Sequence, residues 1–233
     1  MASVSPGADK GDYPWWLVAL ALIALALAGV IVANDLYRQV FSIVLKGLWV
    51  TIFVTLVAFL LATLLGLAIA LMALSESKVL RQIARFYTEV IRGVPVLVLL
   101  FYIAFVGAPA LVAVINVAIS PLVSAGVMEP MLVRDLSLMW RAIIALMIGY
   151  SAFIAEVFRA GIQSVDKGQV EAAKALGLSR VQRFRLVVFP QAIRVILPPL
   201  GNDFVAMVKD SSLVSVLGVA DITQMGKVYA SGS

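Results

Sequence analysis

The sequence lacks two residue types on which much protein chemistry depends: its 233 residues include no cysteine and no histidine. A disulfide framework, thiolate chemistry and acid–base catalysis by imidazole are therefore excluded. A zinc site would have to be built from carboxylates alone, which is improbable. These absences argue against an enzyme, and we expect neither catalytic residues nor a metal site in this chain.

Charge is also scarce, because Asp, Glu, Lys and Arg make up 13% of the chain whereas 63% of its residues are hydrophobic. A soluble domain carries about 25% charged residues, so this composition indicates a membrane protein. The formal net charge of +5 fits the excess of basic residues on the cytoplasmic side of membrane proteins better than a nucleic-acid partner. We therefore predict an all-α protein in membrane lipid, with no nucleic acid bound.

Apolar runs divide the chain into about five transmembrane helices, which we place at residues 15–33, 47–74, 93–107, 139–158 and 195–219. Residues 1–14 precede them as a polar tail. Trp15 and Trp16 open the first run, as is typical of a helix that begins at a membrane interface. A signal peptide is the alternative. Because Lys10 is the only basic residue before the run, we favour a retained helix.

Prolines interrupt the third apolar stretch, which continues from Gly93 to Met128. Pro109 predicts a break at the far membrane face, so that a spanning helix ends near Gly107. A second segment, re-entrant or on the surface, would then reach Met128. Just before this stretch, residues 75–92 carry apolar side chains at helical spacing among basic ones. This pattern predicts an amphipathic helix on the cytoplasmic surface.

The basic residues also predict the topology. With the N-terminus in the cytoplasm, the two polar stretches 75–92 and 159–194 lie inside, and four basic residues lie outside. The inside set is Lys78, Arg81, Arg85, Arg92, Arg159, Lys167, Lys174, Arg180, Arg183, Arg185 and Arg194, and the outside set is Arg38, Lys46, Arg134 and Arg141.

The polar segment 166–190 has an unusually well-marked local structure. Asp166 with Gln169, and Ser179 with Gln182, have the spacing of capping boxes that open two helices. Gly177 stands where the first helix would end in a left-handed cap, and Pro190 ends or kinks the second. We predict a helix, a glycine turn and a second helix on the cytoplasmic face.

The first of these helices contains the row Glu171-Ala172-Ala173-Lys174-Ala175. Small side chains on an exposed helix let another backbone come close, and charges at its rim set the register against a partner. Such a helix is suited to docking in a groove.

At this point the sequence resembles a known family. Glu171-Ala172-Ala173, Gly177 and Pro190 have the spacing of the EAA motif, which marks the permease subunits of ATP-binding-cassette importers. Other blocks are similar to the polar amino acid branch, which serves histidine, glutamine, arginine, glutamate and opines: Arg92-Gly-Val-Pro95, Glu156-Val-Phe-Arg159, Pro190-Gln-Ala-Ile-Arg194, Leu197-Pro-Pro-Leu-Gly201 and Lys209-Asp-Ser-Ser-Leu-Val-Ser215.

The resemblance implies a type I importer transmembrane domain over residues 41–233, with 166–190 as the segment that couples it to a separate ATPase. The implied docking residues are Glu171, Ala172, Ala173, Gly177 and Leu178. The chain has no phosphate loop of the form GxxxxGK[ST], so ATP and Mg²⁺ would be bound by the partner. The resemblance also implies a dimer of ATPases, an extracytoplasmic solute-binding protein, a second permease (identical or a sister) and a prokaryotic inner membrane.

Two departures from the family concern the ends of the permease domain. The family has one more spanning helix after Tyr229-Ala-Ser, whereas this chain stops at Ser233, so we expect the last helix to be missing. The run 15–33 is an extra N-terminal helix. A truncation, and a partial compensation by this extra helix, both stay open.

Ionisable residues inside a membrane are costly and normally face a cavity or a partner. Glu156 and Arg159 are spaced to pair on one helix face. Two hypotheses stay open for Asn202, Asp203, Lys209 and Asp210. They line a translocation path for a zwitterionic solute, or they pair between helices or across a dimer interface.

Two other transporter classes are disfavoured. A secondary transporter is usually longer and shows a repeat of its spanning set. A channel subunit needs a selectivity filter or a ring of charge. We recognise none of these features in the sequence.

Overall fold

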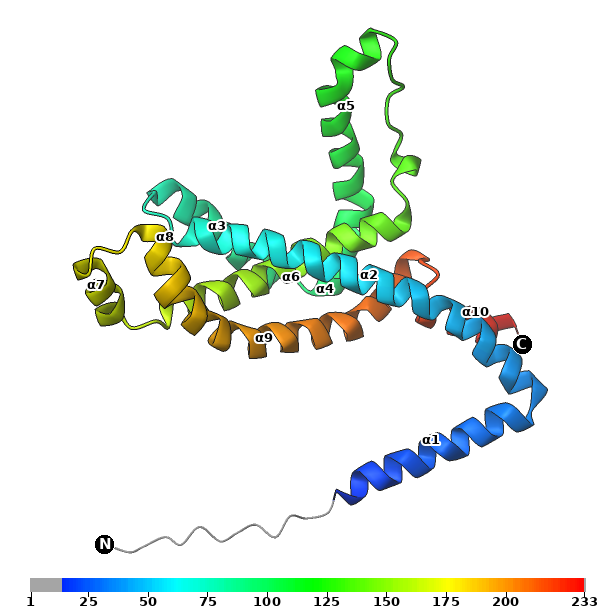
Figure 1. The fold of residues 1–233 in the computed structure, drawn as a ribbon. Coiled ribbons are helices and arrows are strands. Elements are labelled where there is room, and N and C mark those ends of the chain that lie inside the picture. Colours follow the sequence, from blue (N-terminus) through cyan, green and yellow to red (C-terminus); the bar gives the residue numbers. More distant parts are fainter. Residues whose placement is uncertain (1–13, 233) are drawn as a thin grey trace, which may run out of the picture.

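The computed structural model describes residues 14–232, and the regular structure of this part is helical throughout (Figure 1). Its long helices are α1 (Trp15–Ala33), α2 (Asp35–Ala73), α6 (Leu138–Gln163) and α9 (Phe189–Asp210). The shorter ones are α3 (Lys78–Gly93), α4 (Val96–Tyr102), α5 (Ala108–Ser124), α7 (Lys167–Ala175), α8 (Arg180–Arg183) and α10 (Ile222–Gly232). Wide π-helical turns form η1 (Ile103–Gly107) and η3 (Phe184–Val188), and tight 3-10 turns form η2 (Val133–Asp135) and η4 (Ser211–Leu217).

Five helical stretches of the described residues are long and apolar enough to cross a membrane, which confirms the predicted number. They are Trp15–Ala33, Asp35–Ala73, Val96–Ser124, Leu138–Gln163 and Arg180–Leu217. The predicted tail 1–14 lies outside the described residues except for Pro14.

Helix α2 begins well before the predicted start at residue 47. The Asn34 side chain caps it by accepting a hydrogen bond of 2.9 Å from the Leu36 amide. Asp35, Arg38 and Lys46 are exposed on the added turns, and no proline interrupts them. The predicted boundary followed charge, and charge by itself does not end a helix. Helix α1 precedes this corner and has no buried residue.

The core forms where α2 packs against α6, because small residues let the two backbones approach. Ala58 and Ala62 on α2 are fully buried. A Cβ at Gly66 would lie 2.9 Å from the Ser151 carbonyl oxygen, so a larger residue would force the helices apart. The hydroxyl of Thr55 donates to a carbonyl four residues earlier, which satisfies it inside the bundle.

Helix α3 is amphipathic, as predicted, but it packs within the bundle rather than on the membrane surface alone. Ala84 and Thr88 are buried, and α3 contacts both α2 and α6. The Tyr87 hydroxyl donates to the Ile148 carbonyl at 3.1 Å and lies 2.7 Å from Ser151 Oγ, near the middle of α6. The position of α3 at the cytoplasmic surface stays a prediction. The pattern showed an apolar face but did not show that protein, rather than lipid, covers part of it.

The predicted break at Pro109 is wrong, because the helix continues from α4 through η1 into α5. The wide turn η1 directly precedes the first turn of α5, where a proline is tolerated. Arg141 on α6 donates to the Ala104 carbonyl oxygen in η1 at 3.3 Å and thereby anchors the turn.

Beyond η1, helix α5 projects away from the rest of the bundle (Figure 1). The Asn116 side chain holds the returning chain at Met131 by two hydrogen bonds of 2.8 Å, one to the amide and one to the carbonyl. The second segment that we predicted up to Met128 is therefore helical over most of its length and forms an arm. Its re-entrant or surface placement stays a prediction.

The chain after α9 does not end in an irregular tail. Gly218 turns it with a φ of +82°, and the Asp221 carboxylate caps α10 by accepting from the Gln224 amide at 2.8 Å. Helix α10 thus begins before Tyr229, and the expectation that the family's last helix is missing after Tyr229-Ala-Ser stays a prediction. The described part of α10 ends at Gly232.

Candidate functional site

Helix α7 owes its shape to the local signals found in the sequence. The Asp166 side chain accepts from the amides of Gly168 and Gln169, and the helix ends in a Schellman motif around Gly177, whose φ is +78°. In that motif the Leu178 amide donates to the Ala173 carbonyl at 3.2 Å. The second capping box is complete in both directions between Ser179 and Gln182.

The first capping box forms only in part. Asp166 serves as the cap, but the side-chain oxygen of Gln169 accepts a hydrogen bond of 2.6 Å from Gln191 on α9. A residue that sequence spacing assigns to a local cap is therefore used to join two helices.

The five predicted docking residues do not share one surface. Glu171, Ala172 and Gly177 are exposed, whereas Ala173 is buried within the chain at 4% exposure and Leu178 is half-buried. The Schellman motif explains this division, because it brings the side chains before and after the glycine together. Ala173 and Leu178 therefore belong to the support of α7 rather than to its free face.

Leu176, directly before the glycine turn, is not among the predicted docking residues but lies on the free face of α7. It is 82% exposed, the largest exposed fraction of any large hydrophobic side chain in the described part of the chain. Val181 follows the turn and is 75% exposed. The signal in the sequence is a leucine directly before the glycine turn, at the end of a segment of mostly small and polar residues.

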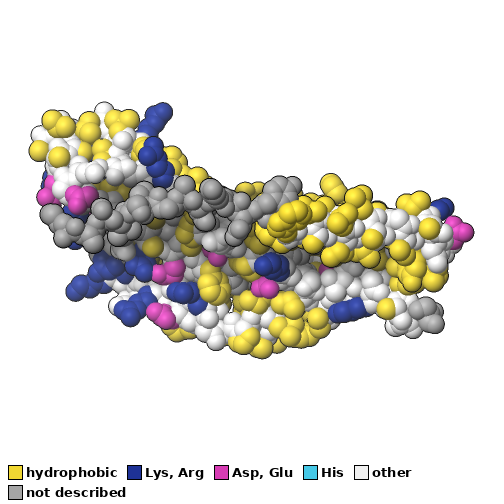
Figure 2. Space-filling model, turned by 90° about the horizontal axis from the view of Figure 1, so that it is seen from below, with side chains coloured by type: hydrophobic (Ala, Val, Ile, Leu, Met, Phe, Trp, Pro, Cys, Tyr) yellow, Lys and Arg dark blue, Asp and Glu magenta, His cyan; other side chains and the backbone are white. Residues whose placement is uncertain are grey.

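Basic side chains gather at the end of the molecule that carries α3, α7 and α8 (Figures 1 and 2). One contact across this end joins Arg180 to Glu76 at 3.9 Å, between the start of α8 and the α2–α3 corner. Both side chains are almost fully exposed, so this ion pair contributes little.

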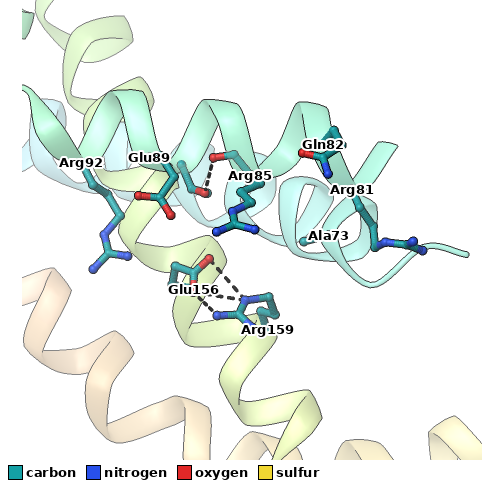
Figure 3. A pocket seen from close by; sticks show the side chains of 9 residues that line it. Ala73, Arg81, Gln82, Arg85, Glu89, Arg92, Glu156 and Arg159 are labelled. Atoms are coloured by element: carbon teal, nitrogen blue, oxygen red, sulfur yellow. Dashed lines mark hydrogen bonds and ion pairs between the residues drawn. The ribbon is translucent and has the colours of Figure 1, made fainter. Parts of the chain in front are cut away.

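A pocket of about 360 Å³ opens between α3 and α6 and is lined mainly by charged side chains (Figure 3). Arg85, Glu89 and Arg92 lie along one stripe of α3 and face Glu156 and Arg159 on α6. Arg159 Nε donates to Glu156 Oε2 at 3.1 Å, so the pair that sequence spacing predicts does form.

A second pocket, also of about 360 Å³, adjoins the first toward α9 and has a mostly apolar lining, and Arg92 and Glu156 line both pockets. The Arg92 guanidinium lies 5.4 Å from the centre of the Phe153 ring, a cation–π contact. Asp203 lines the far side, and its Oδ2 atom is buried without a hydrogen-bond partner among the described residues.

The other polar residues of α9 are placed differently. The Asp210 carboxylate accepts a hydrogen bond of 2.8 Å from the Tyr150 hydroxyl on α6. Asn202 and Lys209 are exposed, and in the described part of the chain no ion pair joins Lys209 to either aspartate. The structure therefore brings Glu156 and Asp203 to one pocket, pairs Asp210 between helices, and leaves Asn202 and Lys209 exposed.

Comparison with known proteins identifies the family. Residues 62–228 match the family described as "Binding-protein-dependent transport system inner membrane component". In Bacillus subtilis (strain 168), the probable amino-acid permease protein YxeN is 35% identical over 83% of this chain and 78% of its own length. The L-cystine transport system permease protein TcyL of that strain is 35% identical, over 79% of this chain and 71% of its own length.

A solved structure shows the same architecture. A chain in the structure titled "Crystal structure of an amino acid ABC transporter with histidines" matches with a TM-score of 0.66 and 38% identity. The match covers 85% of this chain and 83% of that one. By sequence and by fold, this chain belongs to the family of inner membrane components of binding-protein-dependent transport systems, among the amino-acid ABC transporter permeases.

Proposed function

We propose that this chain is the permease subunit of an ATP-driven importer that carries polar amino acids by alternating access across a prokaryotic inner membrane. The observation that carries the proposal is the free face of α7. A short, fully capped helix presents Glu171, Ala172 and Leu176 beside a glycine turn, at the most basic end of the molecule. An exposed leucine flanked by small residues is suited to an apolar groove on a partner.

The charged surface between α3, α6 and α9 is the proposed translocation path. It alternates cationic and anionic groups, as a zwitterionic solute requires, and Glu156 and Asp203 both border it. The exposed polar residues of α9, Asn202 and Lys209, would extend it, whereas Asp210 is engaged by Tyr150 and stabilises the helix pair. Membrane-embedded charges are costly unless they face water or a partner, which favours this use.

The remaining parts of the importer follow from this proposal. Two ATPase subunits would hold ATP and Mg²⁺ and grip α7. A second permease, identical or a sister, would complete the path, and an extracytoplasmic binding protein would deliver the solute. The N-terminus would lie in the cytoplasm, with α1 as an additional membrane helix. Population of inward- and outward-open states would be set by nucleotide.

The test uses the complex reconstituted in vesicles with its ATPase and binding protein. Loaded binding protein is expected to accelerate ATP hydrolysis and to drive solute uptake. A carrier or channel would be indifferent to both. Uptake that continues without ATP, together with no cross-link from α7 to an ATP-hydrolysing protein, would refute the proposal.

A further inference from the structure

The side chain of Gln191 joins three elements at the root of α9. Its Nε2 atom donates to Gln169 Oε1 on α7 at 2.6 Å and to the Val187 carbonyl oxygen in η3 at 2.9 Å. We name this pair of bonds the glutamine clasp. It crosses from the helix with the proposed docking face to the helix that carries Asp203 and Lys209.

The orientation of the clasp follows from chemistry. A carbonyl oxygen only accepts, so the amide nitrogen of Gln191, and not its oxygen, has to face Val187. An amide nitrogen carries two hydrogens, and the second points to Gln169, which must therefore present its oxygen. The donor is on α9 and the acceptor is on α7, and the two glutamines are not interchangeable.

An apolar seat lies beside the clasp. Val165 before α7 and Val170 on it pack with Val188 at the end of η3 and with Ala192 and Ile196 on α9. Gly161 holds the end of α6 against the same surface, because a Cβ there would lie 2.3 Å from Ile196 Cγ1. A groove of about 540 Å³ remains open between α6, α7 and η3, so α7 touches its support over only part of its length.

The seat and the clasp have different roles. Burial of apolar groups stabilises the contact but is not directional. A hydrogen bond at a partly exposed site adds only about 1 kcal/mol, yet it fixes one register of α7 on α9. Because an open groove lies beside the contact between α7 and α9, the register of the two helices is the property of this contact that is most easily lost.

We infer that the glutamine clasp is a positioning device that makes α7 and the start of α9 move as one body. A displacement of α7 by a bound ATPase then reaches the polar residues of α9 directly, with η3 and Pro190 inside the moving unit. Gln169 and Gln191 act through the helices they join and do not touch the solute. The inference rests on the proposed function, and its tests below assume a parent complex that binds the ATPase and transports.

The first test uses two isosteric variants in the reconstituted complex. Gln191→Glu replaces the donor by an acceptor and breaks the clasp, whereas Gln169→Glu keeps the acceptor oxygen that Gln191 needs. For Gln191→Glu we expect the solute moved per ATP hydrolysed to fall about fivefold, the size of effect that one hydrogen bond allows. Gln169→Glu is expected to stay within about twofold of the parent.

Co-purification of the ATPase and the thermal unfolding midpoint are measured for both variants and should not change. Equal losses in both variants would show an effect of added charge, and no loss in either would show that the bond is dispensable. Each of these results overturns the inference. If the parent itself fails to bind the ATPase, the proposed function fails instead, so the two failures are distinguishable.

The second test remains decisive even if Gln191→Glu does not assemble. Because the chain contains no cysteine, the double variant Gln169→Cys/Gln191→Cys can be joined specifically by a short bifunctional thiol reagent, in complex with a cysteine-free ATPase. The unlinked double variant lacks the clasp and should move less solute per ATP than the parent. If α7 and α9 move together, linking the two thiols should restore this ratio toward the value of the parent. Transport that stops on linking would show that the two helices have to separate, and would overturn the inference.

Discussion

At the scale of single residues, the free face of α7 is smaller and more apolar than the motif suggests. Leu176 projects from the structure with 82% of its surface exposed, so its removal should leave the fold intact. Burial of a leucine in a partner is worth about 1.5–3 kcal/mol. We therefore expect Leu176→Ser to weaken ATPase binding at least about tenfold, measured by titration in detergent or nanodiscs.

The matched control for this variant is Val127→Ser. Val127 is also apolar and 69% exposed, but it lies beyond the end of α5. The same binding titration should show no change for it. Equal binding by Leu176→Ser and the parent would remove Leu176 from the docking face.

Lys209 separates the two hypotheses for the polar residues of α9. Its side chain is exposed and makes no ion pair within the described residues, whereas neighbouring Asp210 is held by Tyr150. We expect Lys209→Met to change the kinetics of solute uptake several-fold and to leave assembly of the complex unchanged, because removing one charge from a path alters binding of a charged solute.

The measurement for Lys209→Met is uptake over a range of solute concentrations, beside size-exclusion chromatography of the complex. Loss of assembly with normal uptake per assembled complex would assign Lys209 to a subunit interface.

Residue-level predictions were accurate where local geometry decides and inaccurate where tertiary contacts compete. Asp166, Ser179 and Gly177 cap the helices at the positions that spacing predicts. Gln169 has the spacing of a capping residue, but its side-chain oxygen accepts a hydrogen bond from Gln191 instead. The sequence offered no sign of this, since the two glutamines are distant along the chain.

At the scale of elements, glycine sets how closely helices pack. A Cβ at Gly47 on α2 would lie 2.6 Å from the backbone carbonyl of Asp221, directly before α10. The backbone cannot move aside as a side chain can, and the Thr51 hydroxyl beside it also accepts from the Ile222 amide at 3.1 Å. Gly47→Ala should therefore destabilise the α2–α10 contact by about 1–3 kcal/mol.

The thermal unfolding midpoint of the purified protein checks this prediction, with Gly29→Ala as control. Gly29 is also helical, but a Cβ added there would have no atom of another side chain or helix within 4 Å, so alanine should be neutral or slightly stabilising. A midpoint for Gly47→Ala equal to that of the control would show that α10 shifts without cost.

The elements that could be predicted from the sequence are those defined by apolarity and caps. The errors in the predicted elements concern the effect of a proline on its helix and the surroundings of an apolar helix face. Pro109 follows a wide turn that absorbs the missing amide, so the helix continues instead of ending. Pro190, which we predicted to end or kink its helix, also follows a wide turn. The apolar face of α3 was correctly recognised, but the pattern did not say whether lipid or α6 covers it.

At the scale of the whole molecule, the membrane class was predictable from composition, and the number of spanning stretches was predictable from the apolar runs. The course of α5 was not, since an apolar helix that projects from a bundle has the same sequence signature as one inside it. The polar surface shared by α3, α6 and α9 was only half predicted. Its α3 side, with Arg85, Glu89 and Arg92, depends on a packing direction that the sequence does not encode locally.

The orientation in the membrane yields a prediction for the complete molecule. Asp35 at the α1–α2 corner and Ser124 at the end of α5 should lie outside, and Leu176 should lie in the cytoplasm, if the basic end of the molecule faces inward as we propose. The cysteine-free chain allows one thiol to be placed at each site in turn. In intact cells, a membrane-impermeant thiol reagent should label Asp35→Cys and Ser124→Cys, and should label Leu176→Cys only after permeabilisation.

Each pattern of labelling has a definite meaning. An odd number of proposed spans lies between residues 35 and 176. The two residues should therefore lie on opposite faces of the membrane, and the two labels test this. The reversed pattern would place the proposed ATPase site outside the cell and is incompatible with an importer driven from the cytoplasm. Labelling of Ser124→Cys without Asp35→Cys would keep α7 inside but show that the α1–α2 corner does not reach the outer face, so that α1 is not an additional spanning helix.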